Sequence, residues 1–142
     1  MTQADLLSFL RSHHWAVQSS VSASGAPQSA LVGFAVSDQL EIVFDTLDST
    51  RKALHLRGNP RISFVIGGWI DGDERTVQYE GLADFPEGEE LKRLKEIYFA
   101  AFPDGRDRQA WPGLVYVRAK PAWIRYSDFG RTPPEIQELT FG

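Results

Sequence analysis

Residues 15–46 read WAVQSSVSASGAPQSALVGFAVSDQLEIVFDT, and this stretch decides the fold class. Across 15–23, Trp15, Val17, Ser19, Val21 and Ala23 occupy every second position, and this mostly apolar alternation is the periodicity of a β-strand. A turn at 24–27 leads into 28–36, a longer strand that is apolar on both faces and is therefore expected to be central in its sheet. A second turn precedes a strand over 40–46. Three strands joined by tight turns predict an antiparallel meander.

The rest of the chain alternates strands with short helices. Thr2 and Asp5 form a loose capping box, and the leucines behind them predict a helix that ends near His13. After the first three strands, a helix capped by Asp48 or Ser49 and stopped by Gly58 is expected, followed by strands 61–67 and 75–85. The next helix has Pro86 in its first turn and an apolar stripe at Leu91, Leu94, Tyr98 and Ala101. A loop at 103–112, strands 113–120 and 122–126 with a bend at Pro121, and an irregular tail containing Pro133 and Pro134 complete the chain.

This order of elements predicts a mainly β fold with short helices. Seven strands joined by turns favour an antiparallel barrel over a doubly wound parallel sheet. The chain also lacks the Gly-x-Gly-x-x-Gly fingerprint of dinucleotide-binding folds, and the pair Gly67-Gly68 is expected to form a turn because it does not open a helix.

Composition excludes several classes of protein. With 142 residues, 42% hydrophobic and 24% charged, the chain is expected to form one globular domain over 1–142. It has no cysteine, which removes disulfides, thiolate metal sites and thiol catalysis. The formal net charge of −4 argues against nucleic-acid binding, which calls for a basic face.

The chain shows no targeting signal and no membrane segment. It begins Met1-Thr2-Gln3-Ala4-Asp5, without the basic and apolar regions of a secretion signal. No apolar run approaches the length of a membrane span. We therefore expect a cytoplasmic protein.

The segment Phe44-Asp45-Thr46-Leu47-Asp48-Ser49-Thr50-Arg51-Lys52 runs from the end of a predicted strand into the start of a helix. Free N–H groups and the helix dipole make such a junction a natural site for an anion. The hydroxyls of Ser49 and Thr50 and the cations of Arg51 and Lys52 would add donors for phosphate oxygens. The competing interpretation is a simple helix cap followed by a solvated charged face.

Over 15–85, about half the chain, the sequence resembles the pyridoxamine 5′-phosphate oxidase-related FMN-binding split-barrel family. Three pieces carry this resemblance: Gly25-Ala26-Pro27-Gln28-Ser29; Thr46 through Ser49-Thr50-Arg51-Lys52 to Leu56-x-x-Asn59-Pro60-Arg61-Ile62-Ser63; and Gln78-Tyr79-Glu80-Gly81-Leu82-Ala83. The second piece is the most specific, because it spaces a hydroxyl, an Arg-Lys pair and an Asn-Pro before an apolar strand.

The resemblance implies a split β-barrel that binds flavin mononucleotide (FMN) non-covalently between the two subunits of a homodimer. It assigns the FMN phosphate to Thr50, Arg51 and Lys52, with Ser49 beside them. The implied neighbours of the flavin ring, on other parts of the chain, are Ser29, Ala30, Leu31 and Val32, mainly through their backbone, and the side chains of Thr46 and of Thr76 or Gln78. Trp111 and Trp123 are further candidates for stacking, although aromatic residues of a β-rich domain more often lie in a core or an interface.

The sequence departs from the full oxidase in two places. Ala30 and Ala35 or their neighbours stand where that enzyme has Arg and Lys beside the flavin, and the segment 125–131 lacks its Arg and His pair for the vitamin phosphate. Oxidation of pyridoxamine phosphate is therefore not expected, whereas FMN binding still is.

No catalytic acid, base or metal site is apparent. His13 and His14 are adjacent and so cannot share a helix face, and His55 is remote from both. The leading hypothesis is an FMN-dependent oxidoreductase with an unknown small-molecule substrate or electron donor. The alternatives are a flavin-binding sensor or carrier without turnover, and a split barrel that binds a deazaflavin cofactor or haem.

Overall fold

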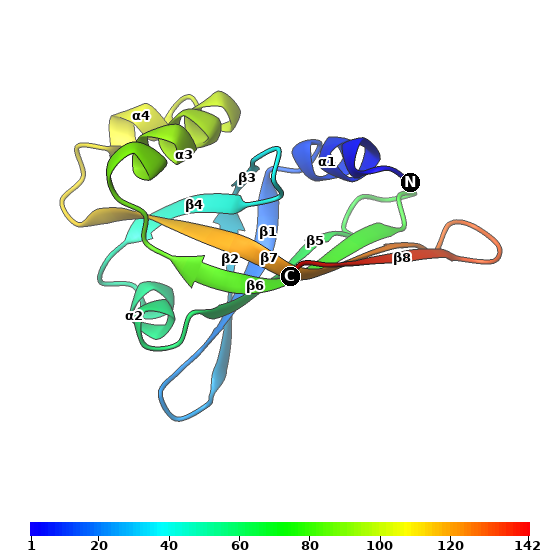
Figure 1. Ribbon diagram of the computed structural model, residues 1–142, viewed down its shortest axis with the longest axis horizontal. Coiled ribbons are helices and arrows are strands. Elements are labelled where there is room, and N and C mark those ends of the chain that lie inside the picture. Colours follow the sequence, from blue (N-terminus) through cyan, green and yellow to red (C-terminus); the bar gives the residue numbers. More distant parts are fainter.

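The computed structural model describes residues 1–142, and its strands form one curled antiparallel sheet (Figure 1). The strands are β1 (Trp15–Val21), β2 (Pro27–Gly33), β3 (Ala35–Val36), β4 (Ile42–Leu47), β5 (Arg61–Gly67), β6 (Arg75–Asp84), β7 (Leu114–Asp128) and β8 (Glu135–Thr140). The helices are α1 (Gln3–Arg11), α2 (Arg51–Gly58), α3 (Gly88–Ala101) and α4 (Gly105–Arg108). None of these helices is long and apolar enough to cross a bilayer.

The strand order β2-β1-β5-β6-β7-β4-β3 explains how the sheet closes. β2 and β3 lie at opposite ends of this order, yet only Phe34 separates them in the chain. The sheet must therefore curl until its two ends approach each other, and β2 does come close to β4. The two strands share no ladder, so a seam remains open between them. The predicted mainly β, antiparallel split barrel is confirmed.

The expected meander of the first three strands is wrong. β1 and β2 form a hairpin, but the apolar segment 28–36 is divided at Phe34, and its second part, β3, pairs with β4 at the other end of the sheet. Phe34 is almost fully buried where the chain crosses from one end to the other. A strand that is apolar on both faces looks the same in sequence whether it is central or crosses a barrel in this way.

Several local expectations are also corrected. Thr50, rather than Asp48 or Ser49, is the N-cap of α2. Pro86 precedes α3, whose N-cap is Glu87, and the predicted loop at 103–112 contains the short helix α4. The supposedly irregular tail forms β8, which pairs with β7 along its whole length.

The predicted bend at Pro121 takes the form of a β-bulge within the continuous strand β7. The register between β6 and β7 shifts there: Glu80 pairs with Trp123 but Gly81 pairs with Pro121, which leaves Ala122 as the extra residue. Proline fits such a position because it has no N–H to contribute to the ladder.

Two clusters of buried apolar side chains fill the molecule. The larger lies inside the curled sheet, where Phe44, Phe64 and Tyr79 stack edge to face. The smaller lies on the other face of β4 and β7, beneath α3, and includes Val43, Tyr98 and Tyr116. β4 is therefore covered on both faces, and α3 with α4 forms a layer outside the barrel, whereas α2 packs against β1 near the other end of the barrel (Figure 1).

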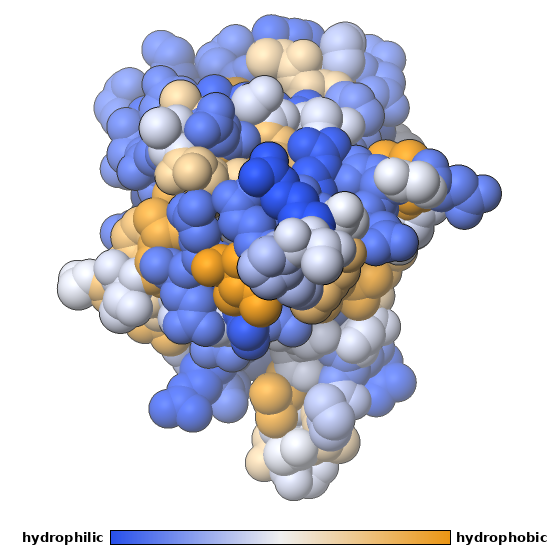
Figure 2. Space-filling view, turned by 90° about the vertical axis from the view of Figure 1, so that its right-hand side faces the viewer, coloured by the Kyte–Doolittle hydropathy of each residue, from blue (hydrophilic) through white to orange (hydrophobic).

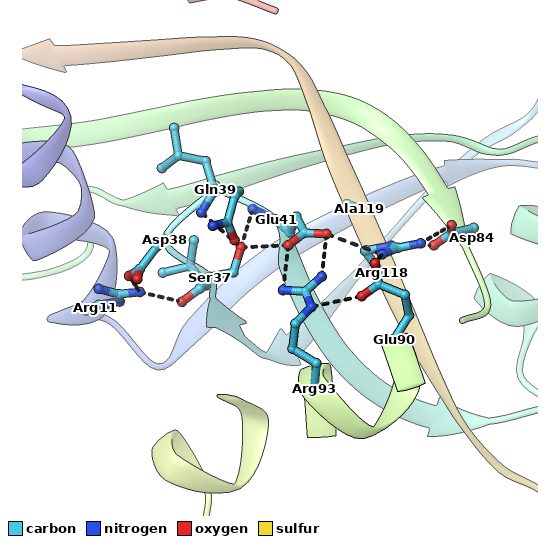
Figure 3. Close-up of polar contacts among 12 residues, drawn as sticks. Arg11, Ser37, Asp38, Gln39, Glu41, Asp84, Glu90, Arg93, Arg118 and Ala119 are labelled. Carbon is cyan, nitrogen blue, oxygen red and sulfur yellow. Dashed lines mark hydrogen bonds and ion pairs between the residues drawn. The ribbon is translucent and has the colours of Figure 1, made fainter. Parts of the chain in front are cut away.

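A polar network also attaches α3 to the barrel (Figure 3). The buried carboxylate of Glu41 accepts hydrogen bonds from Ser37 at 2.9 Å, from Arg93 of α3 at 3.1 Å and from Arg118 of β7 at 3.3 Å. Arg118 also donates two hydrogen bonds to the carboxylate of Asp84, at 2.9 and 2.6 Å. Every charge in the centre of the network thus has an opposite partner, as buried charges require.

Candidate functional site

The junction of β4 with α2 is built around Thr50. Its hydroxyl accepts the N–H of Ala53 at 3.3 Å, which caps the helix, and donates to the carbonyl of Leu47 at 2.9 Å. It also lies 3.1 Å from the hydroxyl of Thr46, which is buried at the end of β4. The cap accepts a hydrogen bond from the backbone N–H of Ala53 only, so the backbone N–H groups of Arg51 and Lys52, at the first two helical positions, have no partner within the helix.

Arg51 and Lys52 follow directly and make no ion pair. Arg57, one turn further along α2, is bound to Asp48 at 2.7 Å, whereas Arg61, which follows α2, also has no ion pair. Neither Arg51 nor Lys52 has a carboxylate oxygen within 4.0 Å. Two unpaired cations in the first helical turn oppose the helix dipole, and an anion bound there would relieve this.

Lys52 differs from Arg51 in being half-buried. Burial lowers the pKa of the Lys52 ammonium, and the negative charge of Asp45 opposes this by raising it. A cation that has lost part of its water and has no direct partner gains more from a phosphate than an exposed lysine would.

Asp45 belongs to a cluster that the sequence did not predict. Its carboxylate accepts a hydrogen bond from the hydroxyl of Tyr98 at 3.1 Å and one from Arg108 Nε at 2.9 Å, and Arg108 also donates to the Tyr98 oxygen at 3.1 Å. The hydroxyl of Tyr116, the partner of Asp45 in the β4–β7 ladder, is buried without a hydrogen bond. Arg108 gave no signal in the sequence because it lies in a segment expected to be a loop.

The predicted residues of β2 divide between the two faces of the sheet. Ser29 and Leu31 point outward, whereas Val32 is buried inside and Ala30 shares its face. β2 is the last strand at its end of the sheet, so along the seam its other edge is unpaired and its backbone groups face β4. The structure thus places these residues where backbone contacts with a ligand in the seam are available.

Thr76, Gln78 and Trp123 lie elsewhere on the same chain. Gln78 faces outward in a row of paired residues that runs through Val65 of β5 and Val17 of β1 to Leu31. With a spacing of about 4.8 Å between strands, three steps place Gln78 roughly 14 Å from Leu31. Within one chain Gln78 and Leu31 are therefore separated by two intervening strands of the sheet.

Trp111 does come close to the junction. It is exposed in the loop that joins α4 to β7, and its backbone N–H donates to the backbone carbonyl of Arg108. Two residues further on, the carbonyl of Gly113 accepts the N–H of Asp48 at 2.8 Å, which fastens this loop to the turn that precedes α2. The predicted residues that gather in one place are Thr46, Ser49, Thr50, Arg51 and Lys52, with the loop of Trp111 beside them.

The main hollows of the single chain do not contain this junction. One of about 550 Å³ lies between α1 and the start of β8, one of about 510 Å³ lies beside Glu41, Arg93 and Arg118, and another of about 460 Å³ lies between α1, β3 and α3. None of the three includes a predicted site residue. The junction is the better candidate for an anion site, because its unpaired donors suit an anion, whereas a concave surface alone selects no ligand.

The junction fits the phosphate of FMN in the chemistry of its groups. It offers two unpaired cations, the Ser49 hydroxyl and two free backbone N–H groups. The hydroxyls of Thr50 and Thr46 lie beside them, and Thr50 would turn its O–H from the Leu47 carbonyl to reach a phosphate oxygen. The two nearby carboxylates, Asp45 and Asp48, are already bound to Arg108 and Arg57.

Comparison with known proteins agrees with the fold. The family model described as Pyridoxamine 5'-phosphate oxidase matches residues 2–128. No curated protein matches the chain.

Three solved structures illustrate the range of similar proteins. A haem-binding protein from Mycobacterium smegmatis has a TM-score of 0.82 at 17% identity, over 99% of this chain and 58% of that one, so the chain spans little more than half of its length. An FMN-binding protein related to pyridoxamine 5'-phosphate oxidase from Nostoc punctiforme has a TM-score of 0.71 at 13% identity, over 98% and 94%. A conserved hypothetical protein from Mycobacterium tuberculosis has a TM-score of 0.75 at 25% identity, over 100% and 92%.

Proposed function

The chain belongs to the pyridoxamine 5′-phosphate oxidase family, and on that premise we propose that it binds FMN non-covalently, with the phosphate at the start of α2, in a cleft between two copies of itself. The observation that carries this proposal is the pair Arg51 and Lys52, which stand unpaired in the first turn of a helix next to three hydroxyl groups. The FMN-binding neighbour from Nostoc punctiforme, of almost the same length, supports it.

Exposed apolar residues on the outer face of the sheet support the proposal that a second copy of the chain binds there. Leu31 is 62% exposed, Trp15 52% and Val65 44%, and the strand register places them close together on β1, β2 and β5. Monomeric proteins rarely leave an apolar sheet face open to water. Figure 2, which views the molecule from the right of Figure 1, shows several separate apolar patches among polar side chains on that side.

A second copy would also complete the site. Thr76, Gln78 and Trp123 lie on this outer face, on β6 and β7. Packing of two outer faces would bring these residues toward the partner's α2 and seam. The cleft would then be hollow only in the dimer, in agreement with the open junction of the single chain.

Bound FMN would supply hydride or electron transfer, and the protein would bind and orient it. In this proposal Thr50, Arg51 and Lys52 hold the phosphate, the backbone of 29–32 lies along the ring, and no side chain at the junction is placed to move a proton. The protein would therefore act as an FMN-dependent oxidoreductase through positioning alone. A sensor or carrier that holds flavin without turnover is the alternative that uses the same site.

The proposal is tested by titrating the protein with FMN and riboflavin and following flavin fluorescence. Loss of the phosphate contacts in Arg51→Ala/Lys52→Ala should weaken FMN binding at least about 100-fold, since hydrogen bonds to charged groups contribute ~1.5–3 kcal/mol each, and should leave riboflavin binding nearly unchanged. Arg61→Ala/Lys92→Ala removes the same two charges from exposed positions elsewhere and is the matched control. Equal losses of FMN and riboflavin would contradict the phosphate role.

The absorbance spectrum of the purified protein separates the ligand classes. A yellow protein with FMN bands supports the proposal. A Soret band would instead favour haem, the ligand of the Mycobacterium smegmatis neighbour. Reduction of bound flavin by a nicotinamide, followed by reoxidation by an acceptor, would distinguish an oxidoreductase from a sensor or carrier.

A further inference from the structure

Asp45 poses a problem for an anion site at the start of α2. Asp45 precedes Thr46 by one residue, and its negative charge raises the pKa of Lys52, although burial lowers that pKa by more. An uncompensated carboxylate so close to a bound phosphate would repel it. The same carboxylate could also pair with Lys52 directly and occupy the ammonium that the phosphate needs.

The structure shows what prevents this. Arg108 Nε donates to Asp45 Oδ2 at 2.9 Å, and the Tyr98 hydroxyl donates to Asp45 Oδ1 at 3.1 Å, so both carboxylate oxygens are engaged. The Asp45 side chain is only 13% exposed and that of Arg108 21%, so water screens this pair weakly. No oxygen of Asp45 lies within 4.0 Å of Lys52 Nζ.

Arg108 is itself held in place by two further contacts. Its Nη1 donates to Asp104 at 2.9 Å and its Nη2 to the Tyr98 oxygen at 3.1 Å. Tyr98 lies in the buried apolar cluster beneath α3, where it stacks on Phe102. The guanidinium therefore draws Asp45 toward α3 and α4, and it neutralises the aspartate charge.

We propose that Arg108, together with Tyr98, is a positioning residue that holds Asp45 away from Lys52 and so keeps Lys52 available for the phosphate of FMN. This inference rests on the proposed function. It assigns a role to the helices α3 and α4, which lie outside the barrel and contribute no predicted phosphate contact of their own.

The test compares FMN with riboflavin in a set of variants. Arg108→Gln frees Asp45 and should weaken FMN binding by about tenfold or more, which corresponds to ~1.4 kcal/mol, without changing riboflavin binding. Adding Asp45→Asn removes the freed charge, so the double variant should recover FMN affinity to near the wild-type value. Arg106→Gln is the matched control, because Arg106 is the other arginine of α4 and pairs with Glu96 on the exposed surface at 3.3 Å.

A purely structural role for Arg108 predicts a different pattern, in which FMN and riboflavin weaken together and Asp45→Asn rescues neither. That pattern, or unchanged FMN binding in Arg108→Gln, would overturn the inference. If Arg108→Gln does not fold, Arg108→Lys, which keeps the charge but loses the planar fork, is measured with and without Asp45→Asn. A wild-type protein that binds FMN no more tightly than riboflavin would overturn the proposed function itself, and that result is visible before any variant is made.

Discussion

Thr50 links the stability of α2 to the phosphate site. Its hydroxyl is both the cap of the helix and the partner of the buried Thr46 hydroxyl. Thr50→Val keeps the shape of the side chain but loses both contacts, so we expect the free energy of unfolding to fall by about 1 kcal/mol, as for other N-caps. Thr50→Ser retains the hydroxyl and serves as the control in urea unfolding. A loss of equal size in Thr50→Ser would show that the methyl group, and not the hydroxyl, matters at this position.

Glu41 should make stability depend on acid pH. Burial by itself would raise the pKa of Glu41, but hydrogen bonds from Arg93 and Ser37 and the charges of Arg93 and Arg118 outweigh burial, and the pKa lies below its usual value of 4.5. A carboxyl whose pKa is lower in the folded than in the unfolded state stabilises the fold fully above its unfolded value, and this contribution is lost as pH falls through the folded value.

We therefore expect the difference in unfolding free energy between the wild type and Glu41→Gln to be largest near neutral pH and to shrink below about pH 4.5. Urea unfolding at several pH values measures it, with the exposed Glu89→Gln as the control that changes little. A difference that stays constant down to pH 3 would mean that Glu41 does not titrate with folding.

Among the elements, the β6–β7 pair depends on Gly81. A Cβ at Gly81 would collide with the backbone carbonyl of Lys120 on β7 and lie 3.1 Å from the ring of Tyr79, next to the bulge. Gly81→Ala should therefore cost about 1–3 kcal/mol, as overpacking of a rigid site does. Gly58→Ala at the end of α2 meets nothing within 4 Å and should leave the melting temperature nearly unchanged. Equal melting temperatures for the two variants would indicate that β7 can move aside.

The sequence predicted the elements better than their connections. Alternation at 75–84 is strong, because one face of that strand is buried and the other is open. At 15–21 the strand was predicted, but the buried face is that of Ala16, Gln18 and Ser20, whereas Trp15 is exposed on the opposite face. The division of 28–36 at Phe34 was missed, because an apolar segment covered on both faces has no alternation to show where pairing changes. The strand β8 was missed because its flanking prolines indicate a loop, whereas it needs only one neighbour, β7, to form.

In the candidate site, too, contacts between neighbours in the chain were predictable and contacts between distant segments were not. Thr50, Arg51 and Lys52 were predicted because a strand end, hydroxyls and cations are consecutive in the chain. Asp45 and Arg108 are 63 residues apart, and only the packing of α3 and α4 on β4 brings them together. Such a contact leaves no local pattern, and a lone arginine in an expected loop is indistinguishable from a solvated one.

At the scale of the whole molecule, binding of FMN should depend on dimerisation. Leu31→Lys places a charge at the centre of the outer apolar face, where a partner would bury it, so we expect a monomer in sedimentation velocity together with loss of FMN binding. Ala100→Lys, on the exposed surface of α3, should leave both the dimer and FMN binding unchanged. A Leu31→Lys variant that stays dimeric, or that binds FMN as a monomer, would contradict the proposed interface.

The most direct measurement is a crystal structure of the protein grown with FMN. We predict that the phosphate oxygens lie within hydrogen-bond distance, about 2.7–3.2 Å, of the Thr50 hydroxyl and the side chains of Arg51 and Lys52, with Gln78 or Trp123 of a partner subunit facing the ring. A flavin whose phosphate points into solvent or binds at any other part of the fold, while Arg51 and Lys52 contact only water, would contradict the central claim.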